Sequence, residues 1–362
     1  MMIIAFIVNG SFESAMGHRA RALAACLQTR YDIRISYREG NKITALVRFL
    51  SDLLRVRPAV SYVFDMSYSG VLGAWLYKLL SRNRLVIDTG DAIYELARST
   101  GSRGSLGLWL TRWFEKFSLR VADGLVVRGS FHQMLLAESG FRAEVIQDGV
   151  NTQQFTPLET NGLRKEYGLD GMLTVGLVGS SVWSERLQMC YGWELVELLR
   201  LLKDAPVKGI MIGGGSGISH LKARCKAYGI EDKILFAGYV PFEELPKHLG
   251  LMDICLSTQT NDVAGQVRTT GKLPLYLACG RYILASRVGE AALVLDEEML
   301  VDYDGVKDDL YPQKLAARVT SLLQHREKVE RSRRNIAVAR QSFDYEILAD
   351  RLAQVIEGQI KK

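Results

Sequence analysis

The sequence has few of the residues that mark disulfide-rich or metal-binding proteins. Its 362 residues include five cysteines, none of which forms a C-x-x-C pair or has a histidine nearby. Scattered thiols of this kind are typical of small buried hydrophobes, so we expect neither disulfides nor a zinc site, and no metal ion. The five are Cys26, Cys190, Cys225, Cys255 and Cys279.

The sequence also lacks long apolar runs and short repeats. The longest early run, MMIIAFIV, is too short to cross a bilayer and has no basic segment before it. We therefore expect a cytoplasmic protein. With 362 residues, of which 48% are hydrophobic and 24% charged, the chain has the size and composition of a globular protein with two domains.

The second half of the chain has no excess charge, whereas the first half is basic. The whole chain has 46 Lys and Arg against 40 Asp and Glu; residues 1–150 hold 19 against 13, which leaves 27 against 27. Arginine outnumbers lysine in residues 1–150 by 16 to 3, and guanidinium groups make forked contacts with phosphate. This favours an anionic partner, either a phosphate-bearing acceptor or an anionic membrane surface rather than nucleic acid, although a solvated basic face explains the same charge.

Short β-branched runs alternate with longer helical patterns along the chain, which predicts parallel, doubly wound α/β sheets. The expected strands are residues 2–8, 31–37, 59–64, 84–90, 124–129 and 143–149, and then 173–179, 207–215, 233–240, 253–258, 281–288 and 299–303. The expected helices include residues 17–30, 44–56, 70–82, 106–122, 131–140, 193–203 and 220–229. Two Rossmann-like halves therefore meet near residues 150–160.

The segment VIQDGVNTQQFTP, residues 145–157, lies at the end of the first half. The pair Asp148 and Gly149 predicts a tight turn in which Gly149 takes a positive φ, a conformation that glycine adopts without strain. We expect Phe155 to pin the linker onto one domain and Pro157 to stiffen its exit.

This segment resembles the interdomain signature of retaining GT-B glycosyltransferases of family four. The likeness covers nearly the whole chain, including VADGLVVRGSFHQMLLAESG, IMIGGGSGISHLKARCKAYG, GKLPLYLACGRYILASRVGEA and the final FDYEILADRLAQVIEGQ. It implies a GT-B fold of two Rossmann-like, doubly wound domains that face a central cleft. Residues 1–155 would then bind the acceptor and 156–342 the nucleotide sugar, while 343–362 would form a helix that crosses back to the first domain.

The resemblance also implies an activity. It points to a retaining transferase that moves a hexose from a nucleoside diphosphate sugar to a saccharide or polyprenyl-linked acceptor, in cell-envelope polysaccharide synthesis. No cofactor, metal ion or nucleic acid would take part, and the protein would be cytoplasmic, peripheral on the inner face of the plasma membrane. The absence of a Ser-His-Asp triad or a carboxylate pair agrees with chemistry in which the leaving diphosphate helps to deprotonate the acceptor.

In the first half, the resemblance places the acceptor and the donor phosphate beside the loop NGSFESAMGHRARALA. Gly17 would allow close backbone approach, His18 is a catalytic candidate or a surface residue, and Arg19 is a candidate phosphate clamp. Asp91, after the strand RLVIDTG, is the second catalytic candidate, as the acceptor of a hydrogen bond from a hydroxyl group of the donor sugar; a helix N-cap is its competing role.

In the second half, IGGGSG at 212–217 does not match G-x-G-x-x-G, because its third glycine is one position early. Gly213 and Gly215 resemble instead the loop that passes close to the base or phosphates of the donor, although a purely structural turn fits them equally well. The family usually has a lysine after the preceding strand; here Arg186 is the nearest cation, at shifted spacing.

The stretch QVRTTGKLPLYLACGR resembles the loop and helix that hold the donor pyrophosphate and ribose. Arg268 and Lys272 are the phosphate candidates, and Tyr276 also matches the family pattern. Leu275 stands where the ribose-binding glutamate is expected, and Val267 stands at the place of an earlier acidic residue. The resemblance leaves Glu290 or backbone groups to bind the ribose.

These departures keep two alternatives open. One is a catalytically inactive GT-B-like protein that binds sugar nucleotides or acts as a partner subunit, which Leu275 favours. The other is a GT-B epimerase, which the few histidines disfavour.

One further segment carries an amphipathic pattern, residues 102–120. Leu106, Trp109, Trp113 and Phe117 recur at helical spacing, while Arg112, Lys116 and Arg120 form a basic row. This pattern is typical of a helix that lies on an anionic membrane, and equally of an apolar stripe packed against the sheet.

Overall fold

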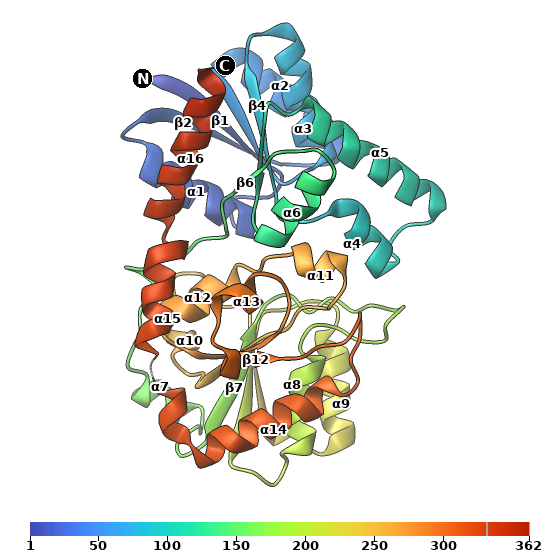
Figure 1. Cartoon of the computed structure of the whole chain (residues 1–362). Helices are drawn as coiled ribbons and strands as arrows, with labels where there is room; N and C mark the ends of the chain where they lie inside the picture. Colours follow the sequence, from blue (N-terminus) through green and yellow to red (C-terminus); the bar gives the residue numbers. More distant parts are fainter. Residues whose placement is uncertain (331, 362) are drawn as a thin grey trace. The chain divides into compact units, whose positions relative to one another are not determined.

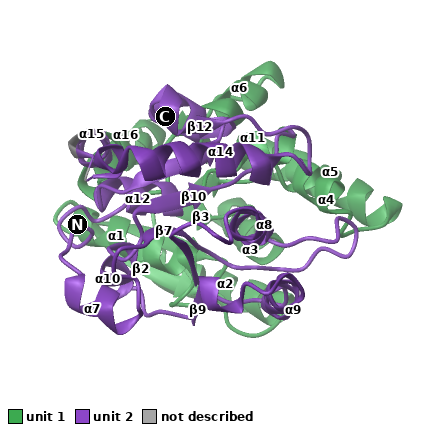
Figure 2. Ribbon diagram, turned by 90° about the horizontal axis from the view of Figure 1, so that it is seen from below, with its two compact units in different colours: residues 1–149, 263–271, 342–362 green, residues 150–262, 272–341 purple. Residues whose placement is uncertain are grey.

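The computed structural model describes residues 1–330 and 332–361, and its strands form two separate parallel sheets (Figure 1). The chain divides accordingly into two units, which Figure 2 distinguishes by colour. Unit 1 comprises residues 1–149, 263–271 and 342–362, and unit 2 comprises residues 150–262 and 272–341. The first division falls within the segment 145–157 that the sequence marked as a linker.

The sheet of unit 1 has the strand order β2-β1-β3-β4-β5-β6, and each strand lies at a predicted position. Its strands are β1 (Met2–Val8), β2 (Tyr31–Tyr37), β3 (Val60–Phe64), β4 (Arg84–Thr89), β5 (Gly124–Val127) and β6 (Glu144–Val145). Its helices are α1 (Ala15–Leu27), α2 (Lys42–Val56), α3 (Tyr68–Leu80), α4 (Ile93–Thr100), α5 (Ser105–Val121), α6 (Ser130–Glu138), α11 (Val263–Val267) and α16 (Tyr345–Ile360).

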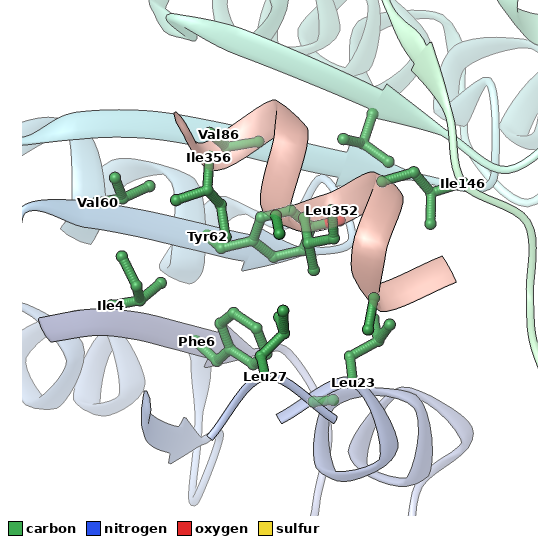
Figure 3. Packing of buried hydrophobic residues seen from close by; sticks show 14 of the residues in the cluster. Ile4, Phe6, Leu23, Leu27, Val60, Tyr62, Val86, Ile146, Leu352 and Ile356 are labelled. Carbon is green, nitrogen blue, oxygen red and sulfur yellow. The ribbon is translucent and has the colours of Figure 1, made fainter. Parts of the chain in front are cut away.

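Strand alternation divides the core of unit 1 between the two faces of the sheet. In β1, Ile4 and Phe6 point to the face that α1 and α16 cover, while Ala5 and Ile7 point to the face covered by α2, α3, α5 and α6. Figure 3 shows the first of these layers, where Leu352 and the other apolar side chains of α16 pack on β1, β3 and β4. The terminal helix therefore completes the core of unit 1.

The sheet of unit 2 has the strand order β12-β11-β10-β7-β8-β9. Its strands are β7 (Leu173–Val178), β8 (Val207–Ile212), β9 (Ile234–Gly238), β10 (Ile254–Ser257), β11 (Tyr282–Ser286) and β12 (Leu300–Val301). Its helices are α7 (Asn161–Glu166), α8 (Trp193–Leu201), α9 (Ile218–Tyr228), α10 (Leu245–Leu249), α12 (Lys272–Ala278), α13 (Gly289–Val294), α14 (Tyr311–Gln324) and α15 (Arg333–Val338). Short 3₁₀ turns occur at Glu231–Lys233, Glu297–Met299 and Arg326–Val329, and a π-helix at Ala339–Phe343.

Two expectations about the linker meet different outcomes. Phe155 is buried and its ring lies 5.1 Å from that of Phe242, so it pins the linker onto unit 2 as predicted. The positive φ expected at Gly149 is wrong, because this glycine is absent from the left-handed residues of the described chain. Gly149 is required for packing instead, since a Cβ there would lie 2.7 Å from side-chain atoms of Tyr345 and Leu348.

One short segment is not where the sequence placed it. Residues 263–271 were expected in the second domain, within 156–342, but they belong to unit 1. Helix α11 packs there against α4 and α6, and Arg268 forms an ion pair with Asp91. Because of these contacts the segment packs as part of unit 1, although the residues on both sides of it in the sequence belong to unit 2.

In both units the strand order reverses beside the first strand, between β1 and β3 and between β7 and β10. Ligands of open parallel sheets bind at the carboxyl ends of the strands next to such a reversal. The loops after β1, β3, β7 and β10 are therefore the places to examine for a site. Within the described residues, no helix is long and apolar enough to cross a membrane.

Candidate functional site

At the carboxyl ends of the unit 1 strands, charged side chains fill the space beneath α1. Asp88, at the end of β4, is fully buried. Its Oδ2 accepts hydrogen bonds from Arg19 Nη2 (3.1 Å) and Tyr62 Oη (2.8 Å), and its Oδ1 accepts one from Arg128 Nε (3.1 Å). Burial alone would raise the pKa of Asp88, but the two guanidinium groups outweigh it and lower that pKa.

The two arginines extend this network to neighbouring loops. Arg19 Nη1 lies 3.5 Å from Asp148 Oδ1, and Arg128 Nη2 pairs with Asp65 Oδ1, in the loop after β3. Asp65 has a φ of 64°, a left-handed conformation that costs a non-glycine residue energy. Gly90 makes room for Arg128, because a Cβ there would lie 2.7 Å from its Nη1.

This geometry changes the role expected of Arg19. The sequence suggested a phosphate clamp, but its side chain is only 1% exposed, and it donates to Asp88 and to the backbone oxygen of Ile146 (2.8 Å). A buried guanidinium with these partners stabilises the strand ends and is not presented to a ligand.

Two predicted residues from distant parts of the chain meet in unit 1. Asp91 Oδ1 accepts from Arg268 Nε at 2.9 Å, and both side chains are partly exposed. The N-cap of α4 is Ala92, so the competing role of Asp91 as a helix cap is wrong. Beside this pair, Thr269 Oγ1 lies 3.5 Å from Asp148 Oδ2.

The loop before α1 is organised around its own backbone. Ser14 caps the helix by accepting from Gly17 N (3.1 Å), and a Cβ on Gly17 would lie 2.3 Å from the carbonyl oxygen of Phe12. Close approach at Gly17 is therefore made by the loop itself. His18 Nδ1 lies 3.0 Å from Arg21 Nη2, and its Nε2 lies 3.7 Å from Glu13 Oε2.

Sequence reasoning missed His132 of α6. It is buried, and its Nδ1 has no hydrogen-bond partner among residues 1–330 and 332–361. Burial lowers the pKa of His132 to about 4; the charge of Asp91 opposes this shift, and that of Arg128 adds to it. The imidazole is therefore neutral at pH 7. Its position in an ordinary helical pattern gave no signal of this environment.

The strand ends of unit 2 are built from glycine instead of charge. Gly213 and Gly215, after β8, have φ values of 121° and 131°. A Cβ on Gly213 would lie 2.1 Å from the carbonyl oxygen of Gly179, and one on Gly215 would lie 2.2 Å from that of Ser181. The loops after β7 and β8 thus touch backbone to backbone, joined by a bond from Ser181 N to Gly214 O (2.8 Å).

A cation and two tyrosines lie beside these loops. Lys272 Nζ is 3.6 Å from the centre of the Tyr191 ring. The same nitrogen would lie 3.9 Å from a Cβ on Gly179. Tyr276 is fully buried, and its hydroxyl accepts from Val178 N at 2.8 Å. Tyr276 therefore supports the end of β7, whereas Lys272 supplies positive charge next to the glycine loop.

The remaining predicted residues of the second half differ in their exposure to solvent. Arg186 is exposed in the loop between β7 and α8, and Glu290 is buried in the first turn of α13. Leu275, at the expected place of the ribose-binding glutamate, is buried in α12, and Val267 is buried in α11 of unit 1. Both apolar substitutions are therefore absorbed by core packing.

A buried carboxyl group that the sequence did not reveal lies near Lys272. Glu194 Oε2 accepts from Gly192 N (3.0 Å), and its Oε1 has no hydrogen-bond partner in the part of the chain that the structure describes. Burial raises the pKa of Glu194, while backbone N–H groups and the charge of Lys272 oppose that shift. The carboxyl lies within a region of helical pattern, which explains why its role was not visible in the sequence.

The two parallel six-stranded sheets with their flanking helices have the GT-B architecture, so the predicted fold class is confirmed. Anabaena HepE in complex with UDP has a TM-score of 0.73 at 14% identity, covering 99% of this chain and 100% of that one. Sucrose-phosphate synthase from Thermosynechococcus elongatus has a TM-score of 0.78 at 15% identity, covering 99% of each chain.

The family match lies mainly in unit 2. Residues 173–325 match the family described as Glycosyl transferases group 1. A 2-deoxystreptamine glucosyltransferase of Streptomyces kanamyceticus is 26% identical over 162 residues, 42% of this chain and 40% of the relative. A GDP-mannose-dependent alpha-(1-6)-phosphatidylinositol monomannoside mannosyltransferase of Mycolicibacterium smegmatis is 28% identical over 171 residues, 46% and 44% respectively. The chain thus spans less than half the length of these curated relatives.

Proposed function

We propose that this protein is a retaining glycosyltransferase that moves a hexose from a nucleoside diphosphate sugar to a saccharide or lipid-linked acceptor, in cell-envelope polysaccharide synthesis. The observation that carries the proposal is the glycine-lined end of β7 and β8, next to the strand reversal between β7 and β10, with Lys272 beside it. Gly213 and Gly215 keep side chains away from the backbone there, and the ammonium group offers a positive charge to a diphosphate. The similarity of residues 173–325 to glycosyl transferases group 1 supports this assignment.

In the proposed reaction, the bond from the anomeric carbon to the diphosphate oxygen breaks while the acceptor oxygen bonds to that carbon on the same sugar face. The acceptor proton passes to the departing diphosphate. Lys272 stabilises the charge that develops on the leaving group, and Arg186, Arg268 and Glu290 are further donor-binding candidates. Asp91 and His18 are the candidates for contacts with the reacting sugar and acceptor.

The domain roles are part of the same proposal. Unit 2 holds the nucleotide sugar and unit 1 the acceptor. The division expected from the sequence, residues 1–155 and 156–342, differs from these units chiefly in residues 263–271, which belong to unit 1. The reaction needs no cofactor, metal ion or nucleic acid, so we expect turnover to persist in EDTA. A polyprenyl-linked acceptor would place the protein on the inner face of the plasma membrane, with an anionic membrane surface as its partner.

Titration calorimetry with UDP-, GDP- and ADP-sugars tests donor binding. We expect one of the three to bind and Lys272→Ala to raise its dissociation constant at least tenfold, the loss of a charge-assisted contact of about 1.5–3 kcal/mol. Lys203→Ala, an exposed lysine beyond α8, is the matched control. Equal donor affinity in the two variants, with the fold intact, would remove Lys272 from the site. The anomeric configuration of the product, measured by NMR, tests retention.

A second candidate is a catalytically inactive protein that binds sugar nucleotides. Leu275 favours it, because this buried side chain takes the place where the family pattern has a carboxylate. The two candidates differ in one measurement. Donor binding without transfer to any saccharide or lipid-linked acceptor, and without slow donor hydrolysis, would favour the inactive protein.

A further inference from the structure

Helix α5 of unit 1 exposes a stripe of large apolar side chains. Leu106 is 69% exposed, Trp109 61% and Trp113 55%, and Leu110 is exposed between them. Their spacing of three and four residues places them on one side of the helix. The alternative that this stripe packs against the sheet is therefore wrong for these residues. The buried side of α5 is formed by Thr111, Phe114, Ser118 and Leu119.

Aromatic contacts hold part of this stripe in place. The Trp113 ring stacks on Phe117 with centroids 5.5 Å apart and an angle of 10°. Phe117 in turn meets the edge of Trp75 of α3 at 5.1 Å and 82°. Both helices lie on the same face of the unit 1 sheet (Figure 1). A side chain fixed in this way loses little conformational freedom when a second surface covers it.

The neighbouring helix α3 adds to the exposed apolar surface at the other end of α5. Lys78 Nζ donates to the carbonyl oxygen of Val121 at 2.9 Å, which places the last turn of α3 beside the last turn of α5. Leu79 and Leu80, in that turn, are exposed. We call the exposed side chains Leu106, Trp109, Leu110 and Trp113 of α5, together with the cations described next, the α5 patch.

The cations of the patch are Arg112, Lys116 and Arg120, which recur every four residues along α5 and are exposed. None of them appears in a salt bridge within residues 1–330 and 332–361, although the Arg112 guanidinium lies 5.4 Å from the centre of the Tyr94 ring. Arg19 and Arg128, by contrast, are buried against carboxylates. The positive charge of the patch is therefore available to an external anion.

We propose that the α5 patch docks unit 1 on an anionic phospholipid bilayer. Tryptophan rings favour the level of the lipid headgroups, where one edge is apolar and the other is hydrated. A basic row beside an apolar stripe is the composition of helices that lie in this layer. Trp109 and Trp113 would enter the layer while Arg112, Lys116 and Arg120 contact lipid phosphates.

A second copy of this chain fits the patch less well than a bilayer. In a two-fold symmetric dimer each patch faces its own copy, so a contact centred on α5 would bring one basic row close to another. Like charges brought together as the interface loses water oppose association. An anionic surface removes this conflict, because it supplies opposite charge along the whole row.

Sedimentation with vesicles of phosphatidylcholine and a rising fraction of phosphatidylglycerol tests the inference. We expect the protein to pellet as the anionic fraction rises and to be released as salt is added, because exposed charges are screened. Tryptophan emission should shift to the blue and be quenched by lipids brominated in the acyl chain. The partition coefficient, measured at one lipid composition, then allows variants to be compared.

Two variants examine the two halves of the patch. Trp109→Ala with Trp113→Ala removes the aromatic anchors, and Arg112→Glu, Lys116→Glu and Arg120→Glu together reverse the basic row. Each should weaken partitioning at least tenfold. The matched controls are exposed residues of unit 2, namely Tyr239→Ala with Leu310→Ala, and Lys203→Glu, Lys226→Glu and Lys247→Glu. These should partition like the parent protein.

The inference is overturned if the parent protein stays in the supernatant at low salt, or if patch variants and controls partition equally. It is also overturned if the tryptophan variant abolishes self-association in sedimentation velocity while vesicle binding is absent, since the patch would then be a dimer interface. Thermal denaturation of each variant checks that the fold is intact.

This inference deepens the proposed function, because it names the surface through which the protein would reach a lipid-linked acceptor. The vesicle assay contains no sugar nucleotide, so its result does not depend on transferase activity. Donor titration of the tryptophan variant should match that of the parent protein. Loss of vesicle binding with donor binding retained would therefore concern the patch alone, and the reverse result would concern the proposed function alone.

Discussion

The carboxyl ends of the two sheets share a topology but are built from opposite materials. In unit 1 the space is filled by Arg19, Asp88, Arg128 and Asp148, which are largely buried and satisfy one another. In unit 2 glycine loops form the ends of β7 and β8, with Lys272 at their side. One end is closed by its own charges, and the other keeps its backbone clear of side chains.

This difference changes how the basic first half of the sequence is understood. Some of its arginines are buried, since Arg19 and Arg128 form ion pairs with buried carboxylates. The positive charge that faces outward is found elsewhere, for example along α5 at Arg112, Lys116 and Arg120. Net charge alone could not separate these uses, because a buried and an exposed arginine count equally.

The largest loss of stability is expected when Asp88, the central carboxylate of the charged cluster in unit 1, is removed. Asp88→Asn removes the fully buried carboxylate that Arg19 and Arg128 share, and only the longer contacts with Asp148 then join the two guanidinium groups. We expect it to lower the free energy of unfolding by about 3–5 kcal/mol. Asp350→Asn, which breaks the exposed pair with Arg30 (2.6 Å), should cost at most about 1 kcal/mol. Urea denaturation of both variants measures the difference. Similar losses would show that the buried arginines find other partners.

In unit 2 the comparison rests on the need for glycine. Gly213→Ala places a methyl group 2.1 Å from the carbonyl oxygen of Gly179 at a φ of 121°, so we expect a loss of about 2 kcal/mol or more. Donor binding should weaken as the loop moves. Gly214→Ala is the matched control, because a Cβ there meets nothing within 4 Å. Equal melting temperatures for the two variants would mean that the loop adjusts freely.

The strands were predictable because their signal is local. Each β-branched run predicted from the sequence contains a strand of one of the two sheets, and the likeness to GT-B enzymes gave the fold class. The glycine loop at 212–217 was also identified, since clustered glycines mark backbone that must lie close to something. What the sequence left open there was the partner, which is the loop after β7.

Contacts between distant residues were not predictable in the same way. Arg19 was interpreted as a ligand clamp because its partner Asp88 lies 69 positions away. Residues 263–271 lie between two segments of unit 2 along the chain, yet they pack in unit 1. The environments of His132 and Glu194 depend on which helix faces which strand end, and helical periodicity does not specify that.

The response to pH extends the comparison in unit 1 to Glu115, a partly buried carboxyl that forms no ion pair within the described residues. Burial raises the pKa of Glu115 to about 7, although it accepts from Tyr94 N at 3.3 Å. A folded-state pKa above the unfolded value makes stability fall as pH rises from about 4.5 to 7. Glu115→Gln should remove this fall and raise stability at pH 8 by about 1–2 kcal/mol, with little change at pH 4.5.

Urea denaturation at pH 5 and pH 8 measures this effect. The change in the free energy of unfolding between the two pH values is compared between the parent protein and Glu115→Gln. Glu138→Gln, an exposed carboxyl at the end of α6, is the control for losing one negative charge. If the Glu115 variant tracks the parent protein at both pH values, the carboxyl is already hydrated in the folded state.

The smallest effect on stability is expected at the ion pair of Asp91 and Arg268, because it is charged but, unlike the buried cluster, partly exposed to solvent. Their side chains are 35% and 43% exposed, so solvent screens the attraction across their 2.9 Å contact. A double-mutant cycle with Asp91→Ala and Arg268→Ala should give a coupling of about 0.2–1 kcal/mol in stability.

If Arg268 binds the donor diphosphate as predicted, it must first leave Asp91. Asp91→Ala should then tighten binding of the free nucleoside diphosphate, which has no sugar for Asp91 to contact, by up to about fivefold, the equivalent of about 1 kcal/mol. Arg98→Ala, an exposed arginine of α4 paired with Glu95, should leave it unchanged. Nucleoside diphosphate affinity that is the same in Asp91→Ala, Arg268→Ala and the parent protein would assign this pair to the architecture of unit 1 and leave Lys272 to hold the diphosphate.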